Sequence, residues 1–145
     1  MIPVVPLPVQ RAIVQHVPRN LAYVPTQLPV GWRYRGWDTG GERPGVPRGL
    51  NIWFTTRHPS GAGFHTYHDR RCTLKAMRRF RIGSVVVAWV NDFGDDQVWR
   101  CIRSSSGMIR LSLSYIGLPS ATSLRVDARH AVVFGRILAT LRHLK

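Results

Sequence analysis

One short stretch of this sequence concentrates positive charge. Six cations fall within twelve residues, and they are Arg70, Arg71, Lys75, Arg78, Arg79 and Arg81. Guanidinium and ammonium groups bind phosphate, sulfate or carboxylate through charge-assisted hydrogen bonds, and arginine does so with two parallel bonds. This stretch is therefore the predicted anion-binding segment. The alternative is an ordinary solvated helix face with no ligand.

Histidines next to this stretch raise the question of a metal. His58, His65 and His68 lie close together in the sequence, and Asp69 and Cys72 follow them. Imidazole, carboxylate and thiolate are the usual zinc ligands, so a site built on this region would indicate a metal-dependent hydrolase. The spacing matches no zinc motif, and we therefore expect neither a metal nor a cofactor. The candidate ligands, if there were a site, would be His65, His68 and Asp69.

The chain has two cysteines, Cys72 and Cys101. In a reducing compartment they would be two buried thiols, whereas in an exported protein they would pair. The loop closed by a disulfide would hold about 30 residues, and it would contribute roughly 3–4 kcal/mol in the chain-entropy model. We favour the disulfide because each cysteine lies where a structured element begins or runs.

Composition limits the class of protein. The 145 residues suit one domain, and a hydrophobic content of 44% argues for a folded core and against disorder. Lysine and arginine number 21 against 7 acidic residues, a formal net charge of +14. This excess favours an anionic polymer, an acidic protein surface or nucleic acid as the partner. A basic protein without any such partner is the alternative.

The chain shows no membrane or export signal of a recognisable kind. No apolar run is long enough to span a bilayer, so no transmembrane segment is expected. The first residues are apolar but broken by prolines, and no basic region precedes them, so they do not form a recognisable signal peptide.

Proline content divides the chain. Six of the ten prolines lie in residues 1–30, where they remove backbone donors and oppose a continuous helix. We expect residues 1–27 to be a proline-rich extended arm, packed on its own domain or on a neighbouring molecule, and residues 28–145 to be a single α+β domain.

Hydrophobic periodicity supplies the elements of that domain. Alternating or continuous apolar patterns predict strands over 32–37, 50–57, 64–67, 84–90, 98–103 and 108–115. A spacing of three between Leu74, Met77 and Phe80 predicts a short helix over 69–80, and a stripe with helical period predicts a long helix over 121–143. The expected fold is therefore α+β: a mostly antiparallel sheet of about five to six strands, one short helix, and a long C-terminal helix packed on one face.

Four pieces in this order resemble a known kind of domain. They are residues 28–34 (LPVGWRY), Cys72, residues 85–89 (VVVAW) and residues 98–101 (VWRC). Over residues 28–143 the chain resembles small disulfide-containing extracytoplasmic domains of uncharacterised proteins from GC-rich bacteria. The resemblance implies export and a Cys72–Cys101 disulfide, and it implies no activity.

The resulting hypothesis is a non-enzymatic binding or interaction domain, extracytoplasmic or secreted, whose arginine-rich segment contacts an anionic polymer or partner. Three alternatives stay open. The first is a cytoplasmic DNA- or RNA-binding protein, which the lack of a signal peptide leaves open. The second is a metal-dependent hydrolase that uses the His58, His65 and His68 region. The third is a subunit of a larger assembly, joined through the proline-rich arm.

Overall fold

A computed structural model describes residues 3–40, 49–57, 61–75, 77–92, 95–115 and 128–145. Two α-helices and a short 3-10 turn are present: α1 (Leu7–His16), η1 (Arg19–Leu21) and α2 (Ala128–Ala139). The strands are β1 (Tyr23–Pro25), β2 (Arg33–Asp38), β3 (Leu50–Thr55), β4 (Ala62–His68), β5 (Arg78–Ile82), β6 (Val85–Asp92), β7 (Asp95–Ser104), β8 (Gly107–Tyr115) and β9 (Leu141–His143).

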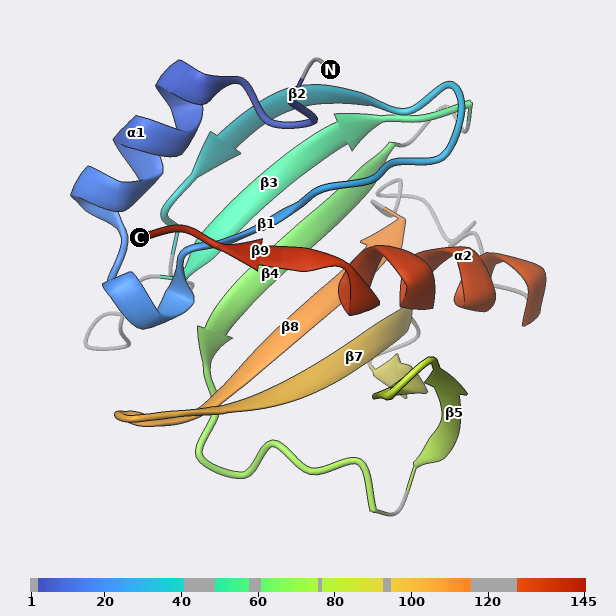
Figure 1. The fold of residues 1–145 in the computed structure, drawn as a ribbon. Coiled ribbons are helices and arrows are strands. Elements are labelled where there is room, and N and C mark those ends of the chain that lie inside the picture. The colour runs from blue at the N-terminus through green and yellow to red at the C-terminus, as the bar shows by residue number, and fades with distance from the viewer. Residues whose placement is uncertain (1–2, 41–48, 58–60, 76, 93–94, 116–127) are drawn as a thin grey trace.

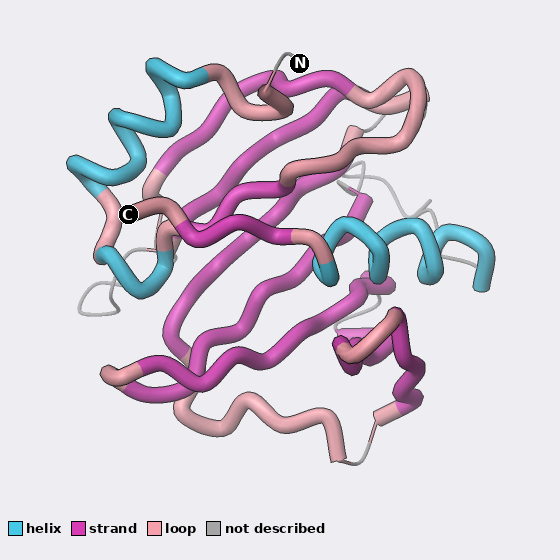
Figure 2. Tube along the Cα trace, in the orientation of Figure 1, coloured by secondary structure: helices cyan, strands magenta, loops and turns pink. Residues whose placement is uncertain are grey.

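The described residues form one large antiparallel sheet and one small one. Seven strands follow the order β2-β3-β4-β8-β7-β6-β5, and β1 pairs with β9 in a separate two-stranded sheet (Figure 1). Strands dominate the described chain (Figure 2). The expected α+β class is therefore wrong, because the described residues are mostly β and form two α-helices that are both short.

One face of the large sheet is apolar, and we call it the core face. Alternate residues of the central strands are completely buried there, including Leu50, Ile52, Phe54, Phe64, Ile109, Leu111 and Leu113. The predicted strand alternation placed these residues together, since residues two apart share a face. The other face carries polar and aromatic side chains such as Asn51, His65, Tyr67, Arg110 and Ser112, and we call it the polar face.

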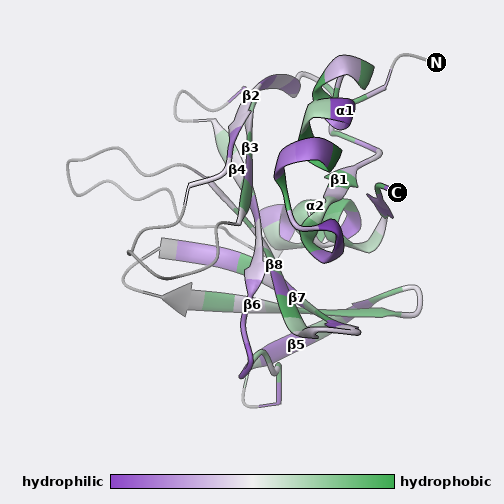
Figure 3. Cartoon of the chain, turned by 90° about the vertical axis from the view of Figure 1, so that its left-hand side faces the viewer, coloured by the Kyte–Doolittle hydropathy of each residue, from purple (hydrophilic) through white to green (hydrophobic). Residues whose placement is uncertain are grey.

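Both ends of the described chain cover the core face. We use the name cover layer for α1, η1, β1, α2 and β9, which lie on one side of the sheet when it is viewed on edge (Figure 3). Four of its side chains, those of Ile13, Leu21, Phe134 and Leu138, are each 0% exposed. The pairing of β1 with β9 joins the two ends into one layer.

A half-buried arginine also ties the cover layer to the sheet. Arg100 alternates with Val98 on the core-face side of β7, and its Nη1 donates to the carbonyl oxygen of Leu138, 2.6 Å away, in the last turn of α2. Terminal carbonyls of a helix lack an intrahelical donor, so a cation is stabilising at that position. Burial lowers the pKa of Arg100 from its ordinary value.

Residues 3–27 contain a helix, a 3-10 turn and a short strand, although their prolines predicted an extended arm. The segment expected to be an extended arm forms α1, with Pro6 as N-cap and Pro8 in its first turn. Proline is tolerated in the first turn because the backbone donors there have no partner within the helix. Pro18 lies just beyond Val17, the C-cap residue of α1, so no proline among residues 3–27 occupies the interior of this helix.

Both predicted domain helices needed correction. The expected helix over 69–80 is absent: residues 69–75 and 77 have no helical structure, and residues 78–82 form strand β5. The C-terminal helix does pack on the core face, but α2 ends at Ala139 and the expected helical residues Leu141–His143 form β9. Residues 121–127 of that predicted helix lie outside the described residues.

A buried hydroxyl offers a test of how the cover layer meets the sheet. Thr66 is 0% exposed, and its Oγ1 donates to the carbonyl oxygen of Leu21, 2.7 Å away. Thr66→Val keeps the shape but leaves that carbonyl unsatisfied, so we expect urea unfolding to show a loss of about 1–3 kcal/mol. Thr55→Val, at an exposed hydroxyl on β3, is the matched control and should change stability by less than about 0.5 kcal/mol. Equal losses in the two variants would contradict this role of Thr66.

Candidate functional site

The predicted anion-binding residues lie on a crossover and an edge strand. The chain leaves β4, third in the sheet order, and must pass β8, β7 and β6 before it adds β5 at the edge. Residues 69–75 and 77 lie along this passage at one end of the sheet (Figure 1). We call residues 69–75 and 77–82, which are the described crossover residues together with β5, the basic segment.

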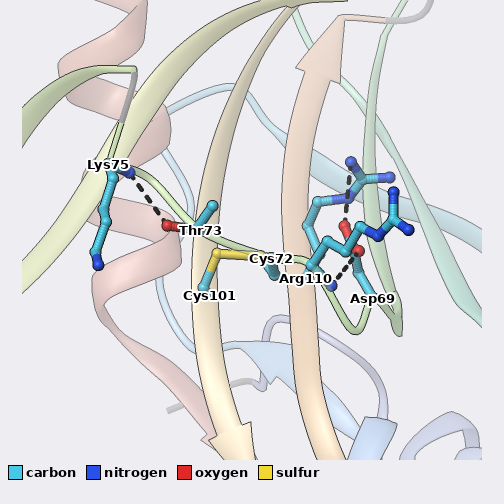
Figure 4. Close-up of a disulfide and its surroundings, with 7 residues drawn as sticks. Asp69, Cys72, Thr73, Lys75, Cys101 and Arg110 are labelled. Carbon is cyan, nitrogen blue, oxygen red and sulfur yellow. Dashed lines mark hydrogen bonds and ion pairs between the residues drawn. A yellow bond between two sulfur atoms is a disulfide. The ribbon is translucent and has the colours of Figure 1, made fainter.

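A disulfide fixes the crossover to the sheet. Cys72 and Cys101 are bonded, as favoured from the sequence, and the described chain has no free cysteine. Cys101 lies in β7 on the same side as Trp99, so the bond holds the crossover against the polar face (Figure 4). Because Cys72 is in a disulfide, its sulfur cannot act as a metal ligand.

Asp69 fixes the beginning of the crossover through both carboxylate oxygens. Its Oδ2 lies 3.6 Å from Nη1 of Arg110, and its Oδ1 accepts from the backbone N–H of Arg71, 3.1 Å away. The backbone N–H of Asp69 also donates to the carbonyl oxygen of Met108. The ion pair and the disulfide lie side by side, since Arg110 and Cys101 are partners across β8 and β7 (Figure 4).

Two aromatic rings enclose the guanidinium group of Arg110. Its central carbon lies 4.3 Å from the ring centre of Tyr67 and 4.0 Å from that of Trp99. Such cation–π contacts strengthen when the cation is withdrawn from water. Burial raises the pKa of the Tyr67 phenol above 10.0, against the opposing effect of Arg110, so the ring stays neutral at neutral pH. Arg110 is therefore a structural support for the crossover.

All six predicted anion-binding side chains are exposed: Arg70, Arg71, Lys75, Arg78, Arg79 and Arg81. They do not share one helical face. Within β5, Arg79 and Arg81 point to one side, whereas Arg78 points to the other, where its guanidinium lies 4.9 Å from the ring centre of Trp89. Among the described residues, Arg110 and Asp69 form an ion pair, and none of these six cations forms one.

A hydrogen-bonded chain of side chains lies at the opposite edge of the polar face. Asn51 Nδ2 donates to Asp38 Oδ1 at 2.7 Å, and Asn51 Oδ1 lies 2.6 Å from His65 Nδ1. Asn51 can accept at that oxygen only if His65 Nδ1 carries a proton. The indole of Trp53 meets His65 edge-on with ring centres 5.3 Å apart, and it lies close over Gly63.

The structure does not unite the candidate metal ligands. His65 and His68 are three residues apart in β4, so they point to opposite faces, and Asn20 rather than a metal ligand contacts His68 at 3.3 Å. Asp69 is engaged by Arg110. In the described part of the chain, no group of three His, Cys, Asp or Glu residues is placed to hold a metal ion. His58 lies outside that part.

Sequence analysis assigned no role to Arg110, which helps to hold the basic segment in place. It also assigned none to Asp38 and Asn51, which form the hydrogen-bonded chain at the opposite edge. The available signal was the strand register, because Tyr67, Arg110 and Cys101 become neighbours once β4, β8 and β7 are aligned. That alignment requires the sheet order, which the sequence pattern does not provide.

Comparison with known proteins finds no similar protein. No family model matches it, and neither a curated protein nor a solved structure matches it significantly. Within the described residues, no helix is both long enough and apolar enough to cross a membrane.

Reduction of the disulfide should destabilise the protein. The bond joins residues 29 apart, and in the chain-entropy model closure of such a loop contributes roughly 3–4 kcal/mol. We expect Cys72→Ser with Cys101→Ser, or treatment with a reductant, to lower the free energy of unfolding by about that amount. Denaturant unfolding measures the loss. An unchanged unfolding midpoint, or two reactive thiols in the untreated folded protein, would refute the structural role of the bond.

The hydrogen-bonded side chains around Asp38 predict a lowered pKa for its carboxyl group. Burial raises the pKa of Asp38, but hydrogen bonds from Asn51, Gly40 and Trp53 and the charge of His65 together lower it below 3.8. The carboxylate therefore contributes stability above its unfolded pKa, and this contribution is lost as the pH falls through the lower folded pKa. NMR titration of the Asp38 carboxyl should show the lowered value, and Asn51→Ala should raise it. A normal pKa in the unsubstituted protein would contradict the network.

Proposed function

We propose that this protein is a non-enzymatic, extracytoplasmic binding domain whose basic segment contacts an anionic polymer. The observation that carries the proposal is the presence of six exposed cations on one tethered segment, with no recorded ion pair to a described carboxylate. Exposed cations that form no ion pair keep their charge available for a ligand. The disulfide and the Asp69–Arg110 pair support this reading, because they hold the segment in place before a ligand arrives.

The arrangement of the cations favours a polymer over a single small anion. Arg79 and Arg81 are two residues apart on one side of an extended strand, which separates their backbones by about 7 Å. Arg70 and Arg71 lie at the other end of the crossover. A ligand with repeated negative charges can contact several of these groups at once, and each further contact then costs less than the first because it is intramolecular.

The proposed compartment rests on the cysteines. A disulfide between Cys72 and Cys101 is compatible with an oxidising location outside the cytoplasm. The resemblance of residues 28–143 to extracytoplasmic domains supports the same location. A thiol count on protein isolated from its native host tests it: no free thiol is expected, and two free thiols would favour the cytoplasm.

Retention on an immobilised sulfated polysaccharide tests the binding surface. Replacing Arg70, Arg71, Arg79 and Arg81 with alanine should strongly lower the salt concentration needed for elution, because released counterions drive such binding. The matched control replaces Arg33, Arg35, Arg129 and Arg136, which are also exposed and carry the same total charge on β2 and α2. This control should elute much closer to the unsubstituted protein.

Two results would overturn the proposal. Equal losses in the two quadruple variants would mean that net charge alone determines retention. Tighter binding to duplex DNA than to the polysaccharide at equal salt, together with two free thiols in protein from the host, would favour the alternative of a nucleic-acid-binding protein.

A further inference from the structure

A groove runs between α1 and the C-terminal residues of the cover layer. Its volume is about 670 Å³, and it is lined by residues of α1 and by residues 142–145. Cavities of roughly 300–1,000 Å³ are the usual size for small-molecule ligands. The groove lies far from the basic segment, since α1 and the C-terminal residues are at the opposite side of the molecule from β5 (Figure 1).

The groove combines exposed apolar side chains with cations. Leu7 is 49% exposed and Val14 is 38% exposed, and both belong to the few large hydrophobic side chains that the described residues leave in solvent. They are seven positions apart in α1, so they share one face of the helix with Arg11 between them. Arg142 and Lys145 line the groove from the C-terminal side. None of the described lining residues has a carboxylate side chain.

Both walls of the groove are held by other contacts. Ile13, on the opposite side of α1, is completely buried in the core. On the C-terminal side, the N–H of Leu144 donates to the carbonyl oxygen of Ala22 at 2.7 Å, and Nε2 of His143 lies 2.6 Å from the carbonyl oxygen of Arg19. A groove that exists before binding spares the ligand the cost of ordering it.

We propose that this groove binds a single-chain anionic amphiphile. Arg11 and Arg142 would contact the anionic head group, and Leu7 and Val14 would contact the aliphatic chain. A hydrophilic polyanion would leave the two apolar side chains uncovered, whereas an uncharged lipid would form no ion pair with the two arginines. The site is separate from the basic segment and does not depend on the function proposed for it.

Isothermal titration with dodecanoate, below its micelle concentration, tests this site. We expect saturable binding with one dodecanoate per chain. Dodecyl maltoside, with a neutral head group, and acetate, with no chain, should each bind much more weakly. Comparable affinity for either compound, or no saturable binding of dodecanoate, would overturn the proposal.

Paired substitutions separate the two parts of the site. Leu7→Asn with Val14→Asn, and independently Arg11→Gln with Arg142→Gln, should each weaken dodecanoate binding by about tenfold, on the scale of two partly exposed aliphatic or ionic contacts. The matched controls are Val132→Asn, at a side chain of α2 that is also 38% exposed, and Arg129→Gln with Arg136→Gln. Both controls should bind as the unsubstituted protein does.

Two controls show whether a loss of dodecanoate binding comes from the groove itself, and not from unfolding or from the basic segment. All the substituted side chains are exposed, so the thermal unfolding midpoint should not change, and the charge variant decides the test if the apolar variant is destabilised. The variant that lacks Arg70, Arg71, Arg79 and Arg81 should keep its affinity for dodecanoate. Loss of binding in that variant, or equal losses in the controls, would place the amphiphile elsewhere and refute the site.

Discussion

The pairing of Tyr23–Pro25 with Leu141–His143 is the contact on which the rest of this structure depends. The large sheet has one strongly apolar face, and the elements that cover it come from the two ends of the described chain. Joining these ends by a two-stranded sheet satisfies their backbone groups and places Ile13, Leu21, Phe134 and Leu138 against the sheet together. The same pairing holds one wall of the groove beside α1.

Because the cover layer buries the core face, only the polar face and the edges of the large sheet can present described side chains of its strands to solvent or to a ligand. The crossover from β4 to β5 lies at the end of the polar face, where a disulfide and a partly buried arginine between two rings hold it. Charged side chains on an edge strand also discourage pairing with another sheet. The arginines of β5 can serve that purpose in addition to the anion binding proposed above, since neither role requires a partner within the chain.

The individual strands could be predicted because a half-buried strand repeats every two residues. Each of the six predicted strands overlaps one of the observed strands β2, β3, β4, β6, β7 and β8. The same reasoning failed for residues 78–82, because a spacing of three between Leu74, Met77 and Phe80 suggested a helix while Arg79 and Arg81 already alternated with Phe80 and Ile82. It also failed for Leu141–His143, which continue an apolar helical stripe but pair with β1.

The sequence alone determined the concentration of cations at residues 70–81, the number of cysteines and most of the strands, because these depend on composition and local periodicity. Only the tertiary structure decided the sheet order, and with it the edge position of β5 and the meeting of Tyr67, Asp69, Trp99, Cys101 and Arg110. The separation of His65 from His68 follows from β4 itself, since residues three apart in a strand point to opposite faces. Contacts between distant residues depend on which strands pair, and local patterns carry no information about that choice.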